Sequence, residues 1–173
     1  MEPGNSTVLK IDVSSIGITD QALLKAAKKL GIKKFDGVFM KEQAIMYPIM
    51  QNKGILNIGD DIGTHWIGYY IEKRVGEVVV NFFDSFGLPV PDLFRERFEG
   101  EIGTYIVENI TKIQHDDSLL CGMYCLYFIN ELDKGRGLVS IVLDFSNKKD
   151  KLWDNDKILI KYFNNFKIKI NFM

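Results

Sequence analysis

The sequence predicts an α+β fold, and three features of the chain carry this prediction. Two segments repeat apolar residues at the three-to-four-residue spacing of an amphipathic helix, and a third is long and continuously apolar. Two further runs are rich in β-branched and aromatic residues and flank a short turn, as in a β-hairpin. A mixture of helices with a hairpin is typical of α+β proteins.

Helices are expected at residues 20–30, 92–100, 119–132 and 153–166. The first places its leucines and an alanine on one face, with Thr19 in the N-cap position and Gly31 where the helix stops. The third is long and apolar enough to be buried, and the last repeats apolar residues along one face.

Strands are expected at residues 55–58, 66–73, 77–84 and 104–114, with an alternating edge strand at 167–173. The second and third form a hairpin around the turn at residues 74–76. Antiparallel pairing about this turn makes paired residue numbers sum to about 149–151, so His65 is expected to face Asp84 or a residue within two of it. An imidazole and a carboxylate would then meet at the open end of the hairpin.

Composition indicates one ordinary domain spanning residues 1–173, with 26% charged residues and no repeat or Pro-rich linker. The net charge of −1 provides no overall basic field for nucleic acid. Seven lysines against three aspartates in residues 148–173 indicate either a solvated face or a surface for anionic partners such as DNA. The chain has no run of 18 apolar residues, so no membrane contact is expected.

The amino-terminal residues lack the basic start and apolar centre of a secretory signal, so secretion is not expected. The chain has two cysteines, four residues apart on one predicted helix, which is not a disulfide framework. A reducing compartment is the simplest interpretation.

Cys121 is a candidate nucleophile because it lies near the expected start of a helix. Asp117 and Ser118 suit the N-cap, and the helix macrodipole favours a thiolate in the first turn. Gly122 follows, and a residue without a Cβ lets a substrate backbone approach closely.

Cys121 can equally be a core residue, because it begins a stripe with helical spacing. The members of the stripe are Cys121, Tyr124, Cys125, Phe128 and Leu132. Cys125, one turn deeper, is expected in the core. A zinc site built from both cysteines, His65 and His115 is a third hypothesis, although the cysteines lack the usual short knuckle spacing.

The chain has two histidines that could serve as the base, and His65 is favoured because of the hairpin argument. Asp84 would hold the tautomer of the ring and stabilise the imidazolium. The alternatives are that His65 is a strand-end residue without a role and that Asp84 only begins a turn. Gln114 has a side-chain amide that could donate to an oxyanion, or it could be a solvated loop residue.

Four features stand in a specific order: His65-Trp66, Asp84 within FFDSFG, Gln114, and Cys121-Gly122 after six intervening residues. This order resembles the adenovirus-type cysteine proteases, whose clan also contains the proteases of ubiquitin-like proteins such as SUMO. Papain has the reverse order, with cysteine before histidine. The similarity covers about residues 19–132 and is weak outside the four features.

The resemblance implies a cysteine protease with a central mixed β-sheet flanked by helices. His65 would be the general base, Asp84 its orienting partner, Cys121 the nucleophile and Gln114 the oxyanion donor. Trp66 would pack beside the site. Trp66 and Gly122 are then expected as substrate-binding residues, and no cofactor or metal is expected.

Members of this family in adenoviruses, virophages and Maverick/Polinton elements cleave capsid precursor proteins during virion maturation, often after small residues such as glycine. The resemblance therefore implies capsid precursors as protein substrates and a location in the virion and infected cell. Adenain has a glutamate where this chain has Asp84. It also has a cysteine for a disulfide-tethered activator, and this chain has none near Gly103. A noncovalent peptide activator and a contact with DNA remain as hypotheses for further partners.

Two rival functions share some of these features. A protease of SUMO or ubiquitin conjugates would use the same residues. In the other, the chain is a non-enzymatic binding domain, and the stripe that begins at Cys121 only packs in the hydrophobic core.

Overall fold

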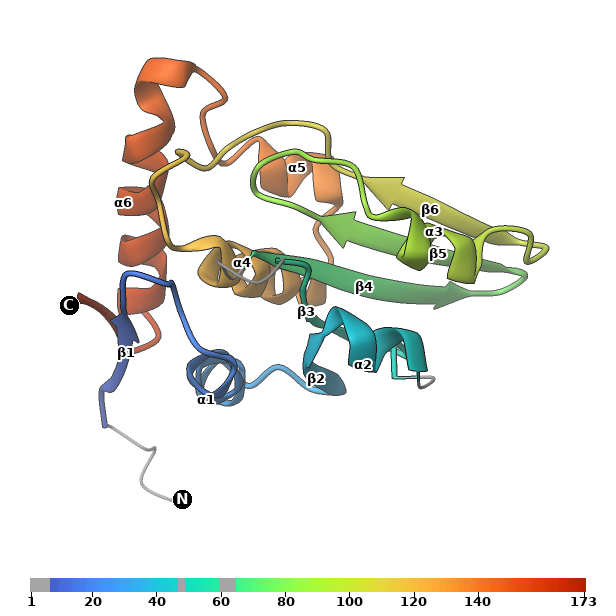
Figure 1. Cartoon of the computed structure of the whole chain (residues 1–173), viewed down its shortest axis with the longest axis horizontal. Helices are drawn as coiled ribbons and strands as arrows, with labels where there is room; N and C mark the ends of the chain where they lie inside the picture. Colours follow the sequence, from blue (N-terminus) through green and yellow to red (C-terminus); the bar gives the residue numbers. More distant parts are fainter. Residues whose placement is uncertain (1–6, 47–48, 60–64) are drawn as a thin grey trace.

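The computed structural model describes residues 7–46, 49–59 and 65–173. Its centre is a five-stranded mixed sheet in the order β2-β3-β4-β5-β6 (Figure 1). The strands are β2 (Phe35–Met40), β3 (Lys53–Asn57), β4 (Trp66–Arg74), β5 (Glu77–Phe83) and β6 (Thr104–Glu108). The pairs β3–β4 and β4–β5 are antiparallel, whereas β2–β3 and β5–β6 are parallel.

A second, two-stranded sheet joins the two ends of the chain. Strand β1 (Leu9–Val13) pairs in parallel with β7 (Ile168–Phe172). The predicted carboxy-terminal strand is confirmed, and its partner is a strand that local sequence patterns did not indicate. Figure 1 shows this small sheet beside the carboxy-terminal helix, away from the central sheet.

Helices cover both faces of the central sheet. They are α1 (Asp20–Leu30), α2 (Lys41–Met46), α3 (Asp92–Phe98), α4 (Cys121–Asp133), α5 (Leu138–Val142), the short 3-10 helix η1 (Lys149–Lys151) and α6 (Leu152–Asn164). Alternate residues of β4 enter two hydrophobic clusters, one shared with α1, α4 and α6 and the other with α2 and α3. The prediction of a mixed sheet flanked by helices is therefore confirmed.

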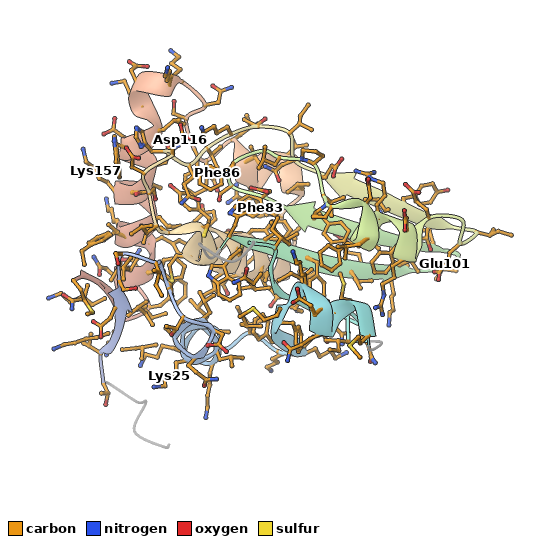
Figure 2. The ribbon with its side chains drawn as sticks, viewed as in Figure 1. Lys25, Phe83, Phe86, Glu101, Asp116 and Lys157 are labelled. Atoms are coloured by element: carbon orange, nitrogen blue, oxygen red, sulfur yellow. The ribbon has the colours of Figure 1, made fainter. Side chains whose placement is uncertain are left out.

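Side chains fill the space between these layers (Figure 2). Phe83 is buried between sheet and helix, where its ring stacks on Phe128 with centroids 4.8 Å apart. The charged residues Lys25, Glu101 and Lys157 project from the periphery. Among the described helices, none is both long enough and apolar enough to span a lipid bilayer.

The helix and hairpin predictions hold in detail. Thr19 Oγ1 accepts a hydrogen bond from the Ala22 N–H at 3.2 Å, and Gly31 adopts the left-handed conformation with φ 73°. In the hairpin Gly68 pairs with Phe83 and Arg74 with Glu77, so paired residue numbers sum to 151.

Other predictions were wrong. The strand expected at 104–114 ends at Glu108, because Asn109 turns to bond the backbone of Asp84. Five of the elements in the described residues had no prediction: β1, β2, α2, α5 and η1. Each has six residues or fewer, so its periodic pattern is weak.

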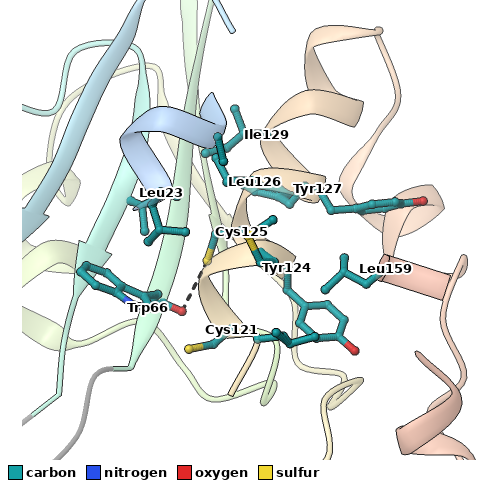
Figure 3. Close-up of a cluster of buried hydrophobic side chains, with 14 of the residues drawn as sticks. Leu23, Trp66, Cys121, Tyr124, Cys125, Leu126, Tyr127, Ile129 and Leu159 are labelled. Atoms are coloured by element: carbon teal, nitrogen blue, oxygen red, sulfur yellow. Dashed lines mark hydrogen bonds between the residues drawn. The ribbon is translucent and has the colours of Figure 1, made fainter. Parts of the chain in front are cut away.

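Helix α4 is the most deeply buried element, with each residue from Cys121 to Leu132 buried. Figure 3 shows Cys125 pointing toward Trp66, whose carbonyl oxygen accepts a hydrogen bond from the thiol at 3.4 Å. Burial raises the pKa of the Cys125 thiol well above its ordinary value. The prediction that Cys125 belongs to the core is therefore confirmed.

Gly122 allows α1 and the Trp66 ring to approach α4 closely. A Cβ at this position would lie 2.8 Å from Leu23 Cδ2 and 3.2 Å from Trp66 Cδ1. Leu23 is fully buried and Trp66 nearly so, which leaves little room for either to move.

We expect Gly122→Ala to reduce the free energy of unfolding by about 1–2 kcal/mol, because overpacking outweighs the better helix propensity of alanine. Gly137→Ala is the matched control, since a Cβ there has no atom within 4 Å and φ is −89°. Chemical denaturation of both variants measures the difference. Equal stability of the two would contradict the packing argument.

Candidate active site

The open end of the hairpin brings His65 and Asp84 together. His65 immediately precedes β4, and Asp84 immediately follows β5. His65 Nε2 and Asp84 Oδ2 lie 2.9 Å apart, and the side chains are 19% and 7% exposed. The register of the hairpin thus produces the contact that was expected from the sequence.

Hydrogen bonds fix both the side chain and the backbone of Asp84. Its Oδ1 accepts a hydrogen bond from the Phe86 N–H at 2.8 Å. Its backbone N–H donates to Asn109 Oδ1 at 2.9 Å, and its carbonyl oxygen accepts from Asn109 Nδ2 at 2.7 Å. With both carboxylate oxygens engaged, Asp84 has one orientation in which to hold the imidazole.

Cys121 is the first residue of α4 and is 6% exposed. The expected cap was wrong: Leu120 occupies the N-cap position and makes no side-chain capping bond. Ser118 Oγ instead accepts hydrogen bonds from the Leu120 N–H and from the Gln114 amide. Cys121 nevertheless lies in the first turn of α4, at the positive end of the helix dipole.

The imidazole of His65 interacts with both Asp84 and Cys121. Burial lowers the pKa of this imidazole, but hydrogen bonds and charge interactions with Asp84 and Cys121 raise it to about 9. Because Nε2 faces Asp84, the buried Nδ1 is the atom left for the thiol. Within the described residues Nδ1 is buried and has no hydrogen-bond partner of regular geometry, although the side chain as a whole interacts with Cys121.

Gln114 is fully buried, so the hypothesis of a solvated loop residue was wrong. Its Nε2 donates to Ser118 O at 2.8 Å and to Ser118 Oγ at 3.2 Å, while its Oε1 accepts from the hydroxyl of Ser85. The backbone N–H of Gln114 donates to Ser85 O at 3.1 Å. Donation to an oxyanion stays a prediction, in which the Nε2 hydrogen of the longer contact, with Ser118 Oγ, turns to the oxyanion while the contact with Ser118 O keeps the amide in place.

Trp66 and Gly122 lie beside Cys121 but face the core. The indole N–H of Trp66 donates to Ile18 O at 3.1 Å, and 2% of the residue is exposed. Gly122 is packed against Leu23 and Trp66. Both residues support the position of Cys121, and their contact with substrate stays a prediction.

His115 makes different contacts from His65. Its ring stacks on Trp153 with centroids 4.3 Å apart, and its Nδ1 accepts from the Asp117 N–H at 3.1 Å. In the described ranges, no three His, Cys, Asp or Glu side chains gather where they could hold a metal ion.

Three residues around the site were missed by sequence reasoning. Ser85 and Phe86 follow Asp84 directly, so the DSFG run held a signal that they belong to the site. The ring of Phe86 lies against His65, with ring centroids 5.0 Å apart. Asn109 had no signal, because its role depends on the parallel pairing of β5 with β6.

We expect the His65 ring to keep its second proton at pH 7 and to lose it near pH 9. Because the pKa is raised from 6.5 to about 9, the protonated ring stabilises the fold fully below about pH 6.5, and this contribution is lost as pH rises through about 9. NMR titration of the ring Cε1–H in a His115→Gln background measures the midpoint. A midpoint near 6.5 would contradict the expected ion pairing, and Asp84→Asn should titrate lower than its parent.

No protein-family model matches this chain, and neither does any curated protein. Among solved structures, the ASFV pS273R protease aligns with 98% of this chain and 70% of its own length, at 14% identity and a TM-score of 0.60. A selenomethionine form of that protease aligns with 53% of this chain and 38% of its own length, at 17% identity and a TM-score of 0.44. The Rickettsia bellii effector RickCE aligns over 86% of this chain and 54% of its own length, at 17% identity and a TM-score of 0.37.

This chain thus spans between 38% and 70% of the lengths of these solved proteins. The alignment with the ASFV pS273R protease extends over almost the whole chain, including the sheet and α4. The chain therefore has a cysteine-protease fold, in agreement with the fold class predicted from its sequence.

Proposed function

We propose that this protein is a cysteine endopeptidase. Cys121 is the nucleophile, His65 the general base, Asp84 the residue that orients the base, and Gln114 an oxyanion donor. The observation that carries the proposal is the 2.9 Å contact between His65 Nε2 and Asp84 Oδ2 beside a cysteine in the first turn of a helix. This arrangement leaves Nδ1 to take the thiol proton.

The first half of the reaction forms a thioester. The thiol proton passes to His65 Nδ1, and the thiolate attacks the carbonyl carbon of the scissile peptide, forming a C–S bond. The carbonyl π electrons move onto oxygen. When the oxyanion collapses, the C–N bond breaks and the imidazolium protonates the leaving amine. Asp84 supports the charged ring throughout, because its carboxylate is fixed by the Phe86 N–H.

The second half releases the acid. His65 accepts a proton from water, whose oxygen attacks the thioester carbonyl. Collapse of the second oxyanion breaks the C–S bond, and the thiolate and imidazolium are restored. In both halves the oxyanion would accept hydrogen bonds from the Gln114 amide and from backbone N–H groups at the start of α4. The N–H groups of a first helical turn have no carbonyl group of a preceding turn to bond to.

The proposed substrates are capsid precursor proteins, cleaved after small residues such as glycine during virion maturation. The support is the resemblance of the four spaced features to the adenovirus-type proteases, and a location in the virion and infected cell follows from the same resemblance. A noncovalent peptide activator and a DNA contact belong to this proposal as well.

The test of substrate class is incubation of the purified protein with the capsid precursors encoded beside its gene, in parallel with SUMO and ubiquitin conjugates. Cleavage of the precursors alone supports the proposal. Cleavage of the conjugates alone would assign the chain to proteases of ubiquitin-like modifiers. Absence of cleavage, together with slow alkylation of the cysteine at pH 6–7, would favour a binding domain, since an ion-paired thiolate reacts rapidly.

We expect Cys121→Ala to abolish cleavage and leave the fold intact, because the side chain loses one sulfur at the edge of the core. The measurement is cleavage of the precursors, with circular dichroism and thermal unfolding as checks on folding. Cys125→Ala is the matched control and should stay active if it folds, since its thiol bonds to the Trp66 carbonyl in the core. Full activity in Cys121→Ala would end the assignment.

We expect Asp84→Asn to reduce kcat by about 10²- to 10⁴-fold with a small change in stability. An asparagine NH₂ facing Nε2 would make that nitrogen an acceptor and place the ring proton on Nδ1, where it blocks proton transfer from the thiol. Steady-state kinetics and chemical denaturation measure the two effects. Unchanged turnover would remove Asp84 from the site.

A further inference from the structure

Helix α6 supplies two buried polar side chains to the loop that precedes the nucleophile. Asn155 is fully buried, and its Nδ2 donates to Ile113 O at 2.6 Å and to Ser146 O at 2.7 Å. Asp156, the next residue, is 7% exposed. The resemblance to known proteases covers residues up to about 132, so it assigns no role to this helix.

The carboxylate of Asp156 interacts with two hydroxyl groups from the active-site region. Its Oδ1 accepts a hydrogen bond from Tyr124 Oη at 2.7 Å. Burial raises the pKa of this carboxyl group, and interactions with the hydroxyl groups of Tyr124 and Ser118 oppose the rise. Tyr124 lies one turn beyond Cys121 on α4. Burying a carboxylate costs free energy unless donors meet it, so these two interactions connect Asp156 with Ser118 and α4.

The hydroxyl of Ser118 has a fixed direction. Its oxygen accepts from Gln114 Nε2 at 3.2 Å and from the Leu120 N–H at 3.4 Å, which uses both lone pairs. Its hydrogen is therefore left for the interaction with Asp156. The carboxylate thus anchors Ser118 in the position from which it contacts Gln114.

Ser118 in turn determines which way the Gln114 amide faces. The carbonyl oxygen of Ser118 accepts hydrogen bonds and cannot donate them, so at 2.8 Å it requires the NH₂ side of the amide. On the other side the hydroxyl of Ser85 donates to Gln114 Oε1. If Ser118 moves, the amide donor moves with it.

We propose that Asp156 is a positioning residue for catalysis: acting through Ser118 and Tyr124, it holds the Gln114 amide and the start of α4 where they can stabilise the oxyanion. This inference rests on the proposed protease function. It assigns to the carboxy-terminal helix a part in the reaction, although none of its residues touches the substrate.

The experiment separates formation of the nucleophile from stabilisation of the oxyanion. Alkylation by iodoacetamide depends on the His65–Cys121 pair and creates no oxyanion. An acetylated tripeptide aldehyde ending in glycinal does create one, since the thiolate adds to the carbonyl carbon and its π electrons move to oxygen. A fluorogenic peptide amide with glycine before the scissile bond reports kcat and KM.

We expect Asp156→Asn to lower kcat about tenfold or more and to weaken aldehyde inhibition in parallel, with KM and the alkylation rate within about twofold of wild type. Tyr124→Phe removes one of the two donors and should show the same pattern more weakly. Asp154→Asn is the matched control, because Asp154 is half-exposed and pairs with Lys157 at 2.9 Å, away from the loop. Thermal unfolding identifies variants that fail to fold.

Two outcomes would overturn the inference. If Asp156→Asn and Tyr124→Phe fold and match Asp154→Asn in kcat and aldehyde affinity, Asp156 is only structural. If alkylation falls as much as kcat, the carboxylate acts on the nucleophile instead of the oxyanion. Failure of the protease proposal looks different, since wild type would then show neither hydrolysis nor aldehyde inhibition, and the inference would fall with it.

Discussion

The antiparallel register of β4 with β5 is the constraint on which the candidate site depends. Pairing of Gly68 with Phe83 brings the residue before one strand and the residue after the other to the same end of the hairpin, where His65 and Asp84 meet. A slip of one residue would turn every β5 side chain to the opposite face of the sheet. Phe83 would then leave the cluster that surrounds α4, so packing of the core and assembly of the site select the same register.

The two interpretations of Cys121 as core residue and as nucleophile are compatible, because they describe two ends of one helix. The stripe that predicts a buried helix is buried from Cys121 to Leu132. The first residue of that helix lies at the edge of the cluster, within reach of His65. Burial of the later turns fixes the position of the first one, and Gly122 permits the close contact with Leu23 and Trp66 that this position requires.

Local sequence patterns predicted what depends on local structure: α1 with its caps, the hairpin register, and the buried α4. They failed where the partner is distant in the sequence. β1 is stabilised by β7 at the other end of the chain, and β2 is a short edge strand. The burial of Gln114 depends on Ser85 and Ser118, and no periodicity within 113–118 indicates it. The spaced His, Asp and Cys predicted that His65 meets Asp84 and Cys121, and the structure adds the residues that orient Asp84 and Gln114.

The loop between β6 and α4 explains why so many buried polar residues surround the site. It has no regular secondary structure, yet Ile113 and Gln114 are fully buried, so their backbone groups need partners from elsewhere. Ser85 accepts from both N–H groups, and Asn155 donates to the Ile113 carbonyl. The loop is thus fixed between the end of β5 and α6. An irregular loop held from two sides can present an amide donor as rigidly as a helix presents its backbone, which is the property that stabilisation of an oxyanion requires.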